Sequence, residues 1–377
     1  ITGAWGKWVY RALCFLVISC PCALVISIPL SFFGGIGAAS KAGILVKGSN
    51  YLEALANAET IVMDKTGTLT KGQFAVTKIM AVNESEQRIL EYSAFAERLS
   101  THPISKSIMT AYQQKNGDMT IMSSNEAVEE KAGFGVIAHK GDGRIAVGNE
   151  KLMAQVLGAD AWAVCKKKYL AGEKALSEGT ICHIAYNNVY WGFLLIEDQL
   201  KDDAAECVTG LKKAGMRLVM LTGDQKGVAD KVAGQLGITE YYAELLPGDK
   251  VDHVEKLLAE KSEKGKLIFV GDGINDAPVL ARADIGIAMG GLGSDAAIEA
   301  ADIVIMTDEP AKITTAMHIS RKTLEIVKQN IIFAIGVKIL ILILAALGVA
   351  SMWWAVFADV GVAFIAILNA MRALKLK

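Results

Sequence analysis

An aspartate near the start of the chain is placed as the nucleophile of an α/β enzyme would be. Asp64 follows the apolar run TIVM at residues 60–63 and opens the segment DKTGTLT at residues 64–70. In parallel sheets, ligands bind beyond the carboxyl ends of the strands. An ionised carboxylate in that position can attack an electrophile and form a covalent intermediate.

A second apolar run ends in a loop suited to binding phosphate. RLVML, residues 217–221, leads into Thr222 and Gly223, whose hydroxyl and backbone N–H groups can donate hydrogen bonds to phosphate oxygens. Lys250 offers a positive charge from a later segment of the chain. Because parallel strands end at the same edge of a sheet, we expect these groups to lie close to Asp64.

A third apolar run, KLIFV, leads into the segment GDGINDAP at residues 271–278. Asp276 in this segment is a further catalytic candidate, and Asn275 is a candidate for cofactor binding. Carboxylate and carbonyl oxygens are the ligands that Mg²⁺ prefers. The predicted magnesium ligands are Asp64, the backbone carbonyl of Thr66, and Asp272.

The segment DKTGTLT resembles the phosphorylation signature of the P-type ATPases, whose aspartate accepts the γ-phosphoryl group of ATP. Together with the TGD and GDGINDAP segments, in this order, it also resembles the haloacid dehalogenase-like fold. The resemblance implies a doubly wound α/β phosphorylation domain that uses ATP and Mg²⁺. It also implies that Asp64 is the residue phosphorylated.

Position 66 distinguishes between two activities that this fold supports. Related phosphatases usually carry a second aspartate two residues after the nucleophile as a general acid and base, but this chain has Thr66. Without a nearby acid and base, an acyl phosphate should hydrolyse slowly. A long-lived phosphoenzyme suits a pump, so we expect a transport ATPase rather than a soluble phosphatase.

Residues 76–190 interrupt the alternation of strands and helices and are numerous enough to form a domain. They resemble the nucleotide-binding domain of the heavy-metal branch of P-type ATPases. The resemblance implies that ATP is bound by Glu97, His102, Gly133, Gly135 and Asn149. A histidine ring can stack on adenine or hydrogen-bond to it, and a Gly-x-Gly loop lets a ligand approach the backbone closely. We therefore predict an inserted α+β nucleotide-binding domain.

The hydrophobic residues, 52% of the chain, are concentrated near its two ends. Residues 8–39, 331–350 and 353–371 are each long and apolar enough to span a bilayer, and the last two form a helical hairpin. Arg372 and Lys375 follow the hairpin, as expected for a cytoplasmic end. The net charge of −1 gives no reason to expect a nucleic-acid partner.

These patterns predict an integral membrane protein, in a plasma (inner) membrane, with residues 40–328 in the cytoplasm. The predicted domains are a first span with its stalk (1–50), a first part of the phosphorylation domain (51–75), the nucleotide-binding domain (76–190), the second part of the phosphorylation domain (191–327) and the hairpin (328–377).

Cys20 and Cys22 flank Pro21 inside the first predicted span. Proline cannot donate a backbone hydrogen bond, so the carbonyl of Val17 should lose its helical partner and the helix should kink or unwind. Local unwinding brings both thiols to one site, where thiolates would select soft or borderline ions. The scattered cysteines show no disulfide framework.

Lys338 and Asp359 place ionisable groups within the hairpin, where such residues are costly and usually functional or paired. Two thiolates, one carboxylate and one lysine become neutral when a divalent ion binds. The pattern resembles the zinc/cadmium/lead class of these ATPases, which implies transport of Zn²⁺, Cd²⁺ or Pb²⁺. The alternatives are a copper-class pump, and an ion pair that only fixes helix packing.

The family's actuator motif Thr-Gly-Glu does not occur in the sequence. We therefore expect a partial pump that binds ATP and accepts a phosphoryl group but does not complete a transport cycle alone. Its actuator region would belong to a longer chain or to a partner. A truncated membrane protein that binds metal or nucleotide without turnover is the remaining alternative.

Overall fold

The structure, a computed structural model, describes residues 5–116, 127–173, 178–272, 276–290, 295–349 and 351–376. The chain divides into two compact units. Unit 1 comprises Ile1–Asp64, Asp203–Met220 and Leu246–Lys377, and unit 2 comprises Lys65–Asp202 and Leu221–Leu245.

The core of unit 1 is a mainly parallel sheet. Six of its strands are β1 (Ile44–Val46), β2 (Ala58–Asp64), β9 (Arg217–Leu221), β11 (Lys266–Gly271), β12 (Ile285–Met289) and β13 (Ile303–Ile305). They lie in the order β1-β13-β12-β11-β2-β9, with β11 parallel to both neighbours and β1 antiparallel to β13. Strands buried on both faces read as continuous apolar runs, which is why the sequence identified three of them.

Helices alternate with these strands along the chain and confirm the predicted α/β class. They are α3 (Ser49–Ala56), α8 (Ala204–Lys213), α10 (Pro247–Glu260), α11 (Ala277–Arg282) and α12 (Asp295–Ala300). The side chain of Asp249 accepts a 2.9 Å hydrogen bond from the backbone N–H of Leu246 and caps the start of α10. Proline in the first turn, here Pro247, also favours a helix start. The local sequence therefore fixes the turn that carries Lys250.

Unit 2 contains a six-stranded antiparallel sheet. Its strands lie in the order β3 (Thr70–Ala81), β8 (Val189–Leu200), β7 (Thr180–Tyr186), β6 (Gly143–Gly148), β5 (Gly135–Lys140) and β4 (Val128–Lys131). The helices are α4 (Glu86–Glu97), α5 (Pro103–Asn116), α6 (Glu150–Leu157), α7 (Ala159–Cys165) and α9 (Lys226–Leu236), with a short strand β10 (Glu240–Tyr242) after α9. The antiparallel sheet with its helices confirms the α+β class predicted for the insertion.

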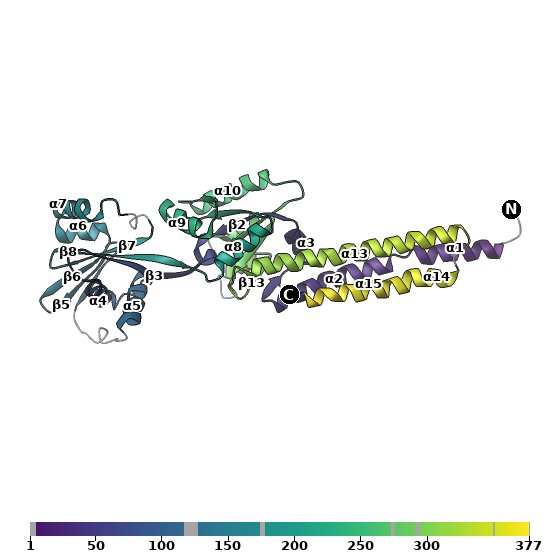
Figure 1. The fold of residues 1–377 in the computed structure, drawn as a ribbon, viewed down its shortest axis with the longest axis horizontal. Coiled ribbons are helices and arrows are strands. Elements are labelled where there is room, and N and C mark those ends of the chain that lie inside the picture. The colour runs from purple at the N-terminus through teal and green to yellow at the C-terminus, as the bar shows by residue number, and fades with distance from the viewer. Residues whose placement is uncertain are drawn as a thin grey trace. The chain divides into compact units, whose positions relative to one another are not determined.

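Helices cover both faces of this antiparallel sheet (Figure 1). On one face, α4 and α5 contribute Phe95 and Ile108 to a buried cluster that also contains Trp191. On the other, α6 and α7 contribute Met153 and Trp162 to a second cluster. Each face therefore has its own hydrophobic core, as expected for a sheet whose strands alternate their side chains between two covered faces.

The remaining helices of unit 1 form a bundle of apolar segments (Figure 1). They are α1 (Trp5–Ser19), α2 (Cys22–Lys41), α13 (Lys312–Ala346), α14 (Met352–Val356), the π-helical turn η6 (Phe357–Gly361), α15 (Val362–Ala370) and the 3₁₀ turn η7 (Met371–Lys375). Among the described residues, three segments are long and apolar enough to cross a membrane: Trp8–Lys41, Lys312–Ala346 and Met352–Lys375. This confirms the predicted number of spans.

The first span breaks at Pro21, between α1 and α2, as predicted. The carbonyl of Val17 lacks its regular helical partner and instead accepts a 3.3 Å bond from the N–H of Cys20, one residue earlier. One detail of the predicted spans was wrong. The first hairpin helix begins at Lys312 rather than at residue 331, because its first turns are amphipathic and pack Ile313 and Met317 into the core of unit 1. A hydropathy pattern detects only the fully apolar part of such a helix.

Candidate functional site

Three carboxylates and one lysine meet at the ends of the parallel strands in unit 1. Asp64 ends β2, Asp272 follows β11, and Asp276 precedes α11. One ligand oxygen from each carboxylate lies within 4.8 Å of the others. The Nζ atom of Lys250 on α10 donates to Asp64 Oδ1 at 2.6 Å and to Asp276 Oδ1 at 2.8 Å. The structure thus brings four of the predicted catalytic and magnesium residues together.

The electrostatics of this cluster favour an additional cation. Burial, and then the neighbouring Asp276 and Asp272 carboxylates, raise the pKa of Asp64 to about 7, although Lys250 opposes the shift. Burial alone would lower the pKa of Lys250, but Asp64 and Asp276 raise it. One lysine therefore does not balance three closely spaced carboxylates, and a cation among them would favour the ionised form of Asp64.

The oxygen atoms of this cluster fit Mg²⁺ better than any softer metal. Mg²⁺ binds through one or two carboxylates together with waters and phosphate oxygens. Asp64 and Asp272 match the predicted ligands, and Asp276 offers a third carboxylate at the same place. Bound there, Mg²⁺ would neutralise negative charge on a transferring phosphoryl group.

The loop that follows Asp64 lies in unit 2 and is held by residues that the sequence reasoning missed. Thr66 has extended backbone angles and Gly67 has φ +70°, a conformation that favours glycine. The carbonyl of Gly67 accepts a 2.6 Å bond from Lys201 Nζ. The hydroxyl of Thr70 donates to an oxygen of Asp198 at 2.5 Å. Two residues, one at the end of β8 and one just after it, therefore hold the loop that follows Asp64.

Lys65 links this loop to the TGD segment within unit 2. Its side chain is only 4% exposed, and its Nζ lies 2.5 Å from Asp224 and 3.7 Å from Asp198. Lys65 and Asp224 stand within the DKTGTLT and TGD segments, but their pairing is not visible in the sequence. Asp198 and Lys201 belong to the charged run EDQLKDD at residues 197–203, which begins inside the end of β8 and directly follows its apolar part. Their position after an apolar run was the sequence feature that could have identified them as site residues.

Thr222 and Gly223 also belong to unit 2. Thr222 is buried, and its hydroxyl oxygen accepts a 3.1 Å bond from the N–H of Asp224, which leaves its O–H able to donate. A Cβ atom on Gly223 would lie 3.1 Å from the carbonyl oxygen of Leu245, so the loop passes close to a neighbouring segment. Asn275, the other predicted cofactor residue of the phosphorylation domain, lies outside the described residues.

The predicted nucleotide residues lie around the α4–α5 connection and the start of α6. His102 is exposed, and its Nδ1 accepts a 3.2 Å bond from the N–H of Ile104. Because a backbone N–H can only donate, a neutral His102 ring carries its proton on Nε2. Glu97, at the end of α4, is 5% exposed and accepts a 2.6 Å bond from Ser105.

Asn149 has a structural function that the sequence did not indicate. Its Oδ1 accepts bonds from the N–H groups of Lys151 and Leu152 and caps α6. Its Nδ2 donates to the carbonyl of Gly133 at 2.8 Å. Asn149 therefore ties the Gly133–Gly135 loop to a helix start, and the φ angles of these glycines, +75° and +138°, lie where other residues are strained.

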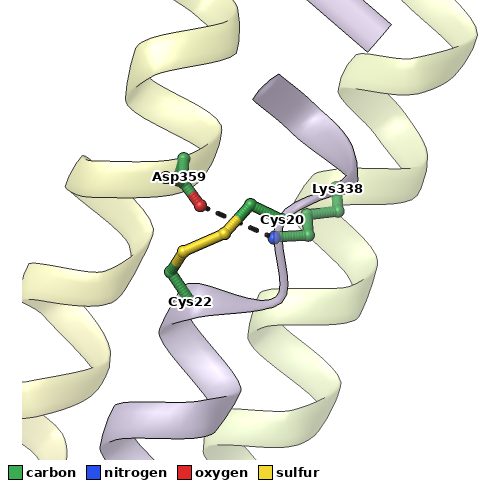
Figure 2. Close-up of a disulfide and its surroundings, with 4 residues drawn as sticks. All are labelled: Cys20, Cys22, Lys338 and Asp359. Atoms are coloured by element: carbon green, nitrogen blue, oxygen red, sulfur yellow. Dashed lines mark ion pairs between the residues drawn. A yellow bond between two sulfur atoms is a disulfide. The ribbon is translucent and has the colours of Figure 1, made fainter. Parts of the chain in front are cut away.

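The membrane residues Cys20, Cys22 and Asp359 form a second cluster, in unit 1. Both sulfur atoms and one carboxylate oxygen lie within 4.8 Å of one another. Lys338 Nζ lies 3.8 Å from Asp359 Oδ1. Figure 2 shows four side chains converging: Cys20 from the break between α1 and α2, Cys22 from the start of α2, Lys338 from α13 and Asp359 from η6. Among the described residues, neither Lys338 Nζ nor Asp359 Oδ1 has a hydrogen-bond partner. A buried carboxylate oxygen that makes an ion pair but no hydrogen bond fits a site that receives a metal ion.

The cysteine pair differs from the two thiolates expected from the sequence, because the structure joins Cys20 and Cys22 in a disulfide. Pro21 interrupts the span between α1 and α2 and leaves the two Cα atoms 5.5 Å apart, within the range that a disulfide requires. The same break is what brings both sulfurs to one place. Since the thiolate is the metal ligand, the metal-binding form is the reduced pair.

Comparisons with known proteins identify the family to which the chain belongs. A haloacid dehalogenase-like hydrolase family model matches residues 58–284. The chain is 55% identical to a cadmium, zinc and cobalt-transporting ATPase of Bacillus subtilis, over 99% of this chain and 51% of that protein. It is 51% identical to a zinc-transporting ATPase of Synechocystis, over 98% of this chain and 49% of that protein. The chain thus spans about half the length of these relatives.

The fold of the chain is also similar to that of a solved protein structure. The fold is similar to the crystal structure of a zinc-transporting PIB-type ATPase in its E2.Pi state, with a TM-score of 0.87 and 35% sequence identity. The match covers 99% of this chain and 59% of that chain.

Proposed function

Because the chain belongs to the haloacid dehalogenase-like hydrolases and is homologous to metal-transporting P-type ATPases, we propose that it accepts the γ-phosphoryl group of ATP on Asp64. The observation that carries the proposal is the cluster of Asp64, Asp272, Asp276 and Lys250 at the strand ends. In this reaction an Asp64 oxygen forms a bond to the γ-phosphorus while the bond to the bridging oxygen breaks, and ADP leaves.

Each residue of the cluster has a distinct part in this reaction. Lys250 orients the Asp64 carboxylate through a 2.6 Å bond and offers positive charge where phosphate oxygens would lie. Asp64, Asp272 and Asp276 hold Mg²⁺. Thr222 and the backbone of Gly223 supply hydrogen-bond donors to the phosphoryl oxygens, and ATP is bound by the predicted residues of unit 2. Thr66 leaves the acyl phosphate without a neighbouring acid and base.

The transported substrate is a divalent metal ion held by reduced Cys20 and Cys22 together with Asp359. Relatives of this chain are named for zinc, cadmium and cobalt, and we add lead because thiolates suit it. Lys338 balances the charge of the site and separates from Asp359 when the ion binds. The protein lies in the plasma (inner) membrane, with residues 40–328 in the cytoplasm.

Radioactive labelling tests the phosphorylation. The chain, reconstituted in lipid with Mg²⁺ and a reductant, should acquire acid-stable ³²P from [γ-³²P]ATP, and hydroxylamine should remove it. Asp64→Asn should abolish the label. Asp252→Asn, an exposed carboxylate of the same α10 helix that carries Lys250, should leave it unchanged. Equal labelling of Asp64→Asn and the unchanged chain would refute Asp64 as the acceptor.

A metal series tests the substrate class. Zn²⁺, Cd²⁺, Co²⁺ and Pb²⁺ should increase the initial rate of labelling, whereas Cu(I) should not. Asp359→Ala should lose this response and keep ATP binding, because Asp359 is remote from the nucleotide residues in the sequence and lies in a membrane helix. Oxidation of the cysteine pair should suppress the response until a reductant restores it. A response to Cu(I) alone would favour the copper class instead.

A further inference from the structure

Glu97 is a buried carboxylate held by a neighbouring hydroxyl group. It lies at the end of α4 and is 5% exposed, and burial of a charged group is costly unless hydrogen bonds compensate for it. Ser105, itself 2% exposed, donates from its Oγ to Glu97 Oε2 at 2.6 Å. Among the residues that the structure describes, Ser105 is the hydrogen-bond donor identified for this carboxylate.

Ser105 also stands next to the predicted adenine-binding histidine. It lies in the first turn of α5, which begins at Pro103 directly after His102. His102 is itself attached to this turn, through the bond from the N–H of Ile104 to its Nδ1. One helical turn therefore carries the histidine ring and the hydroxyl that fixes Glu97. A displacement of this turn would move both groups together.

Burial and the Glu130 carboxylate oppose the ionisation of Glu97. Burial raises the pKa of Glu97, Ser105 lowers it through the hydrogen bond, and Glu130 on β4 raises it. Cys182 on β7 is close enough for Glu97 to raise its thiol pKa, after the larger effect of burial, so this thiol stays neutral. Arg98, the next residue, packs over the Phe95 ring, 4.1 Å from its centre. Ser105 is thus the group identified as favouring the charged carboxylate.

We infer that Ser105 is a positioning residue for nucleotide binding, which holds Glu97 ionised and oriented so that its carboxylate accepts a hydrogen bond from the adenine amino group. The inference rests on the proposed function, because it takes Glu97 to be a nucleotide ligand. Ser105 itself does not contact the nucleotide. Its removal should therefore act only through Glu97.

Measured ATP affinity tests this inference. Ser105→Ala should raise the Kd for ATP about 5- to 20-fold at pH 7, as expected for the loss of one hydrogen bond to a charged group. The loss should grow as the pH falls, because Ser105→Ala raises the pKa of Glu97 further and the ionised form is the one that binds. The two proteins differ only at residue 105, so the ratio of their Kd values isolates the effect of Ser105.

Ser107→Ala is the matched control. Ser107 is on the same helix and is also buried, but its Oγ donates to the local carbonyl of Ile104 at 2.7 Å. Its Kd and pH profile should match those of the unchanged chain. In a Glu97→Gln background, Ser105→Ala should have no further effect, and the affinity should no longer show the pH dependence attributed to Glu97.

The outcomes separate this inference from the proposed function. If Glu97→Gln and His102→Ala both leave the Kd for ATP unchanged, the predicted nucleotide site is wrong. A second set of results would refute the inference while leaving the nucleotide site intact. In that case Glu97→Gln weakens ATP binding, but Ser105→Ala raises the Kd by the same factor at every pH, or by the same factor with and without Glu97→Gln. Ser105 would then only stabilise the local fold.

Discussion

Asp64 lies in a site where its negative charge is unfavourable until a cation arrives. The folded chain holds a proton on Asp64 up to about pH 7, whereas an unfolded aspartate releases it near pH 3.8. The protonated Asp64 carboxyl therefore contributes its full stabilisation of the fold below about pH 3.8. This contribution is lost as the pH rises through about 7. The same arrangement would favour binding of a cation beside Asp64.

We expect Asp64→Asn to be more stable than the unchanged chain at pH 8, in the presence of EDTA. Asparagine keeps the shape and a hydrogen-bond acceptor for Lys250 but has no charge to bury. The stability advantage should grow by about 2–3 kcal/mol between pH 5 and pH 8. Chemical unfolding followed by tryptophan fluorescence measures it. Asp252→Asn should show no such growth, and an advantage of Asp64→Asn that does not vary with pH would contradict the assigned shift.

At the residue scale, the sequence predicted side chains that follow strands but not their distant partners. Asp64, Asp272 and Asp276 were recognised because each stands at the end of an apolar run or in the loop that follows one. The pairing of Lys65 with Asp198, and of Lys201 with Gly67, joins segments more than a hundred positions apart. No local pattern specifies such pairs. The Cys20–Cys22 disulfide was missed for another reason, because two nearby cysteines suit a metal as well as a covalent bond.

At the scale of elements, glycines let the membrane helices approach closely. A Cβ atom on Gly35 of α2 would lie 2.4 Å from Thr323 Oγ1 on α13. Thr323 is fully buried, its β-branched side chain is stiff, and its hydroxyl already donates to the carbonyl of Ile319 at 2.8 Å. The contact therefore cannot adjust by a simple side-chain rotation. Small residues at such contacts are typical of helix packing in membranes.

We expect Gly35→Ala to destabilise the bundle by about 1–3 kcal/mol, because the added methyl group forces α2 and α13 apart. Thermal unfolding in detergent measures the change. Gly336→Ala, on the opposing α13 helix, is the control, since a Cβ atom there would meet nothing within 4 Å. It should be neutral or stabilising, because alanine favours a helix over glycine. Equal effects of both substitutions would show that the α2–α13 contact is not tight.

The elements themselves differed in how well the sequence predicted them. The buried parallel strands were clear because both of their faces are apolar. The first half of α13 was missed, since Lys322, Glu325 and Lys328 form an exposed polar face that hides its continuity with the apolar half. The π-helical turn η6 around Asp359 also has no sequence signature, although such turns often occur at functional sites.

At the scale of the molecule, α13 belongs to both parts of unit 1. Its start packs into the core of the α/β sheet, and its second half lies in the bundle of apolar helices. It runs without interruption from Lys312 to Ala346, which corresponds to about 50 Å. Its start is tied to α8 through a 2.7 Å bond from the N–H of Ala311 to Asp203, and its second half carries Lys338 of the membrane site. A continuous helix transmits displacement and rotation between its ends because its backbone hydrogen bonds resist bending.

We expect Lys328→Pro to uncouple the two ends of α13. Proline in a helix interior removes a backbone donor, clashes with the preceding turn and costs about 3 kcal/mol or more. Lys328 is exposed, so Lys328→Ala changes the side chain without disturbing the helix and is the matched control. With Zn²⁺ present, Lys328→Ala should keep the metal-dependent increase in ³²P labelling. Lys328→Pro should bind ATP with unchanged affinity but label at one rate with and without metal. A normal metal response in Lys328→Pro would mean that another element carries the coupling, and the α1–α2 segment, with its break at Pro21, would be the next to test.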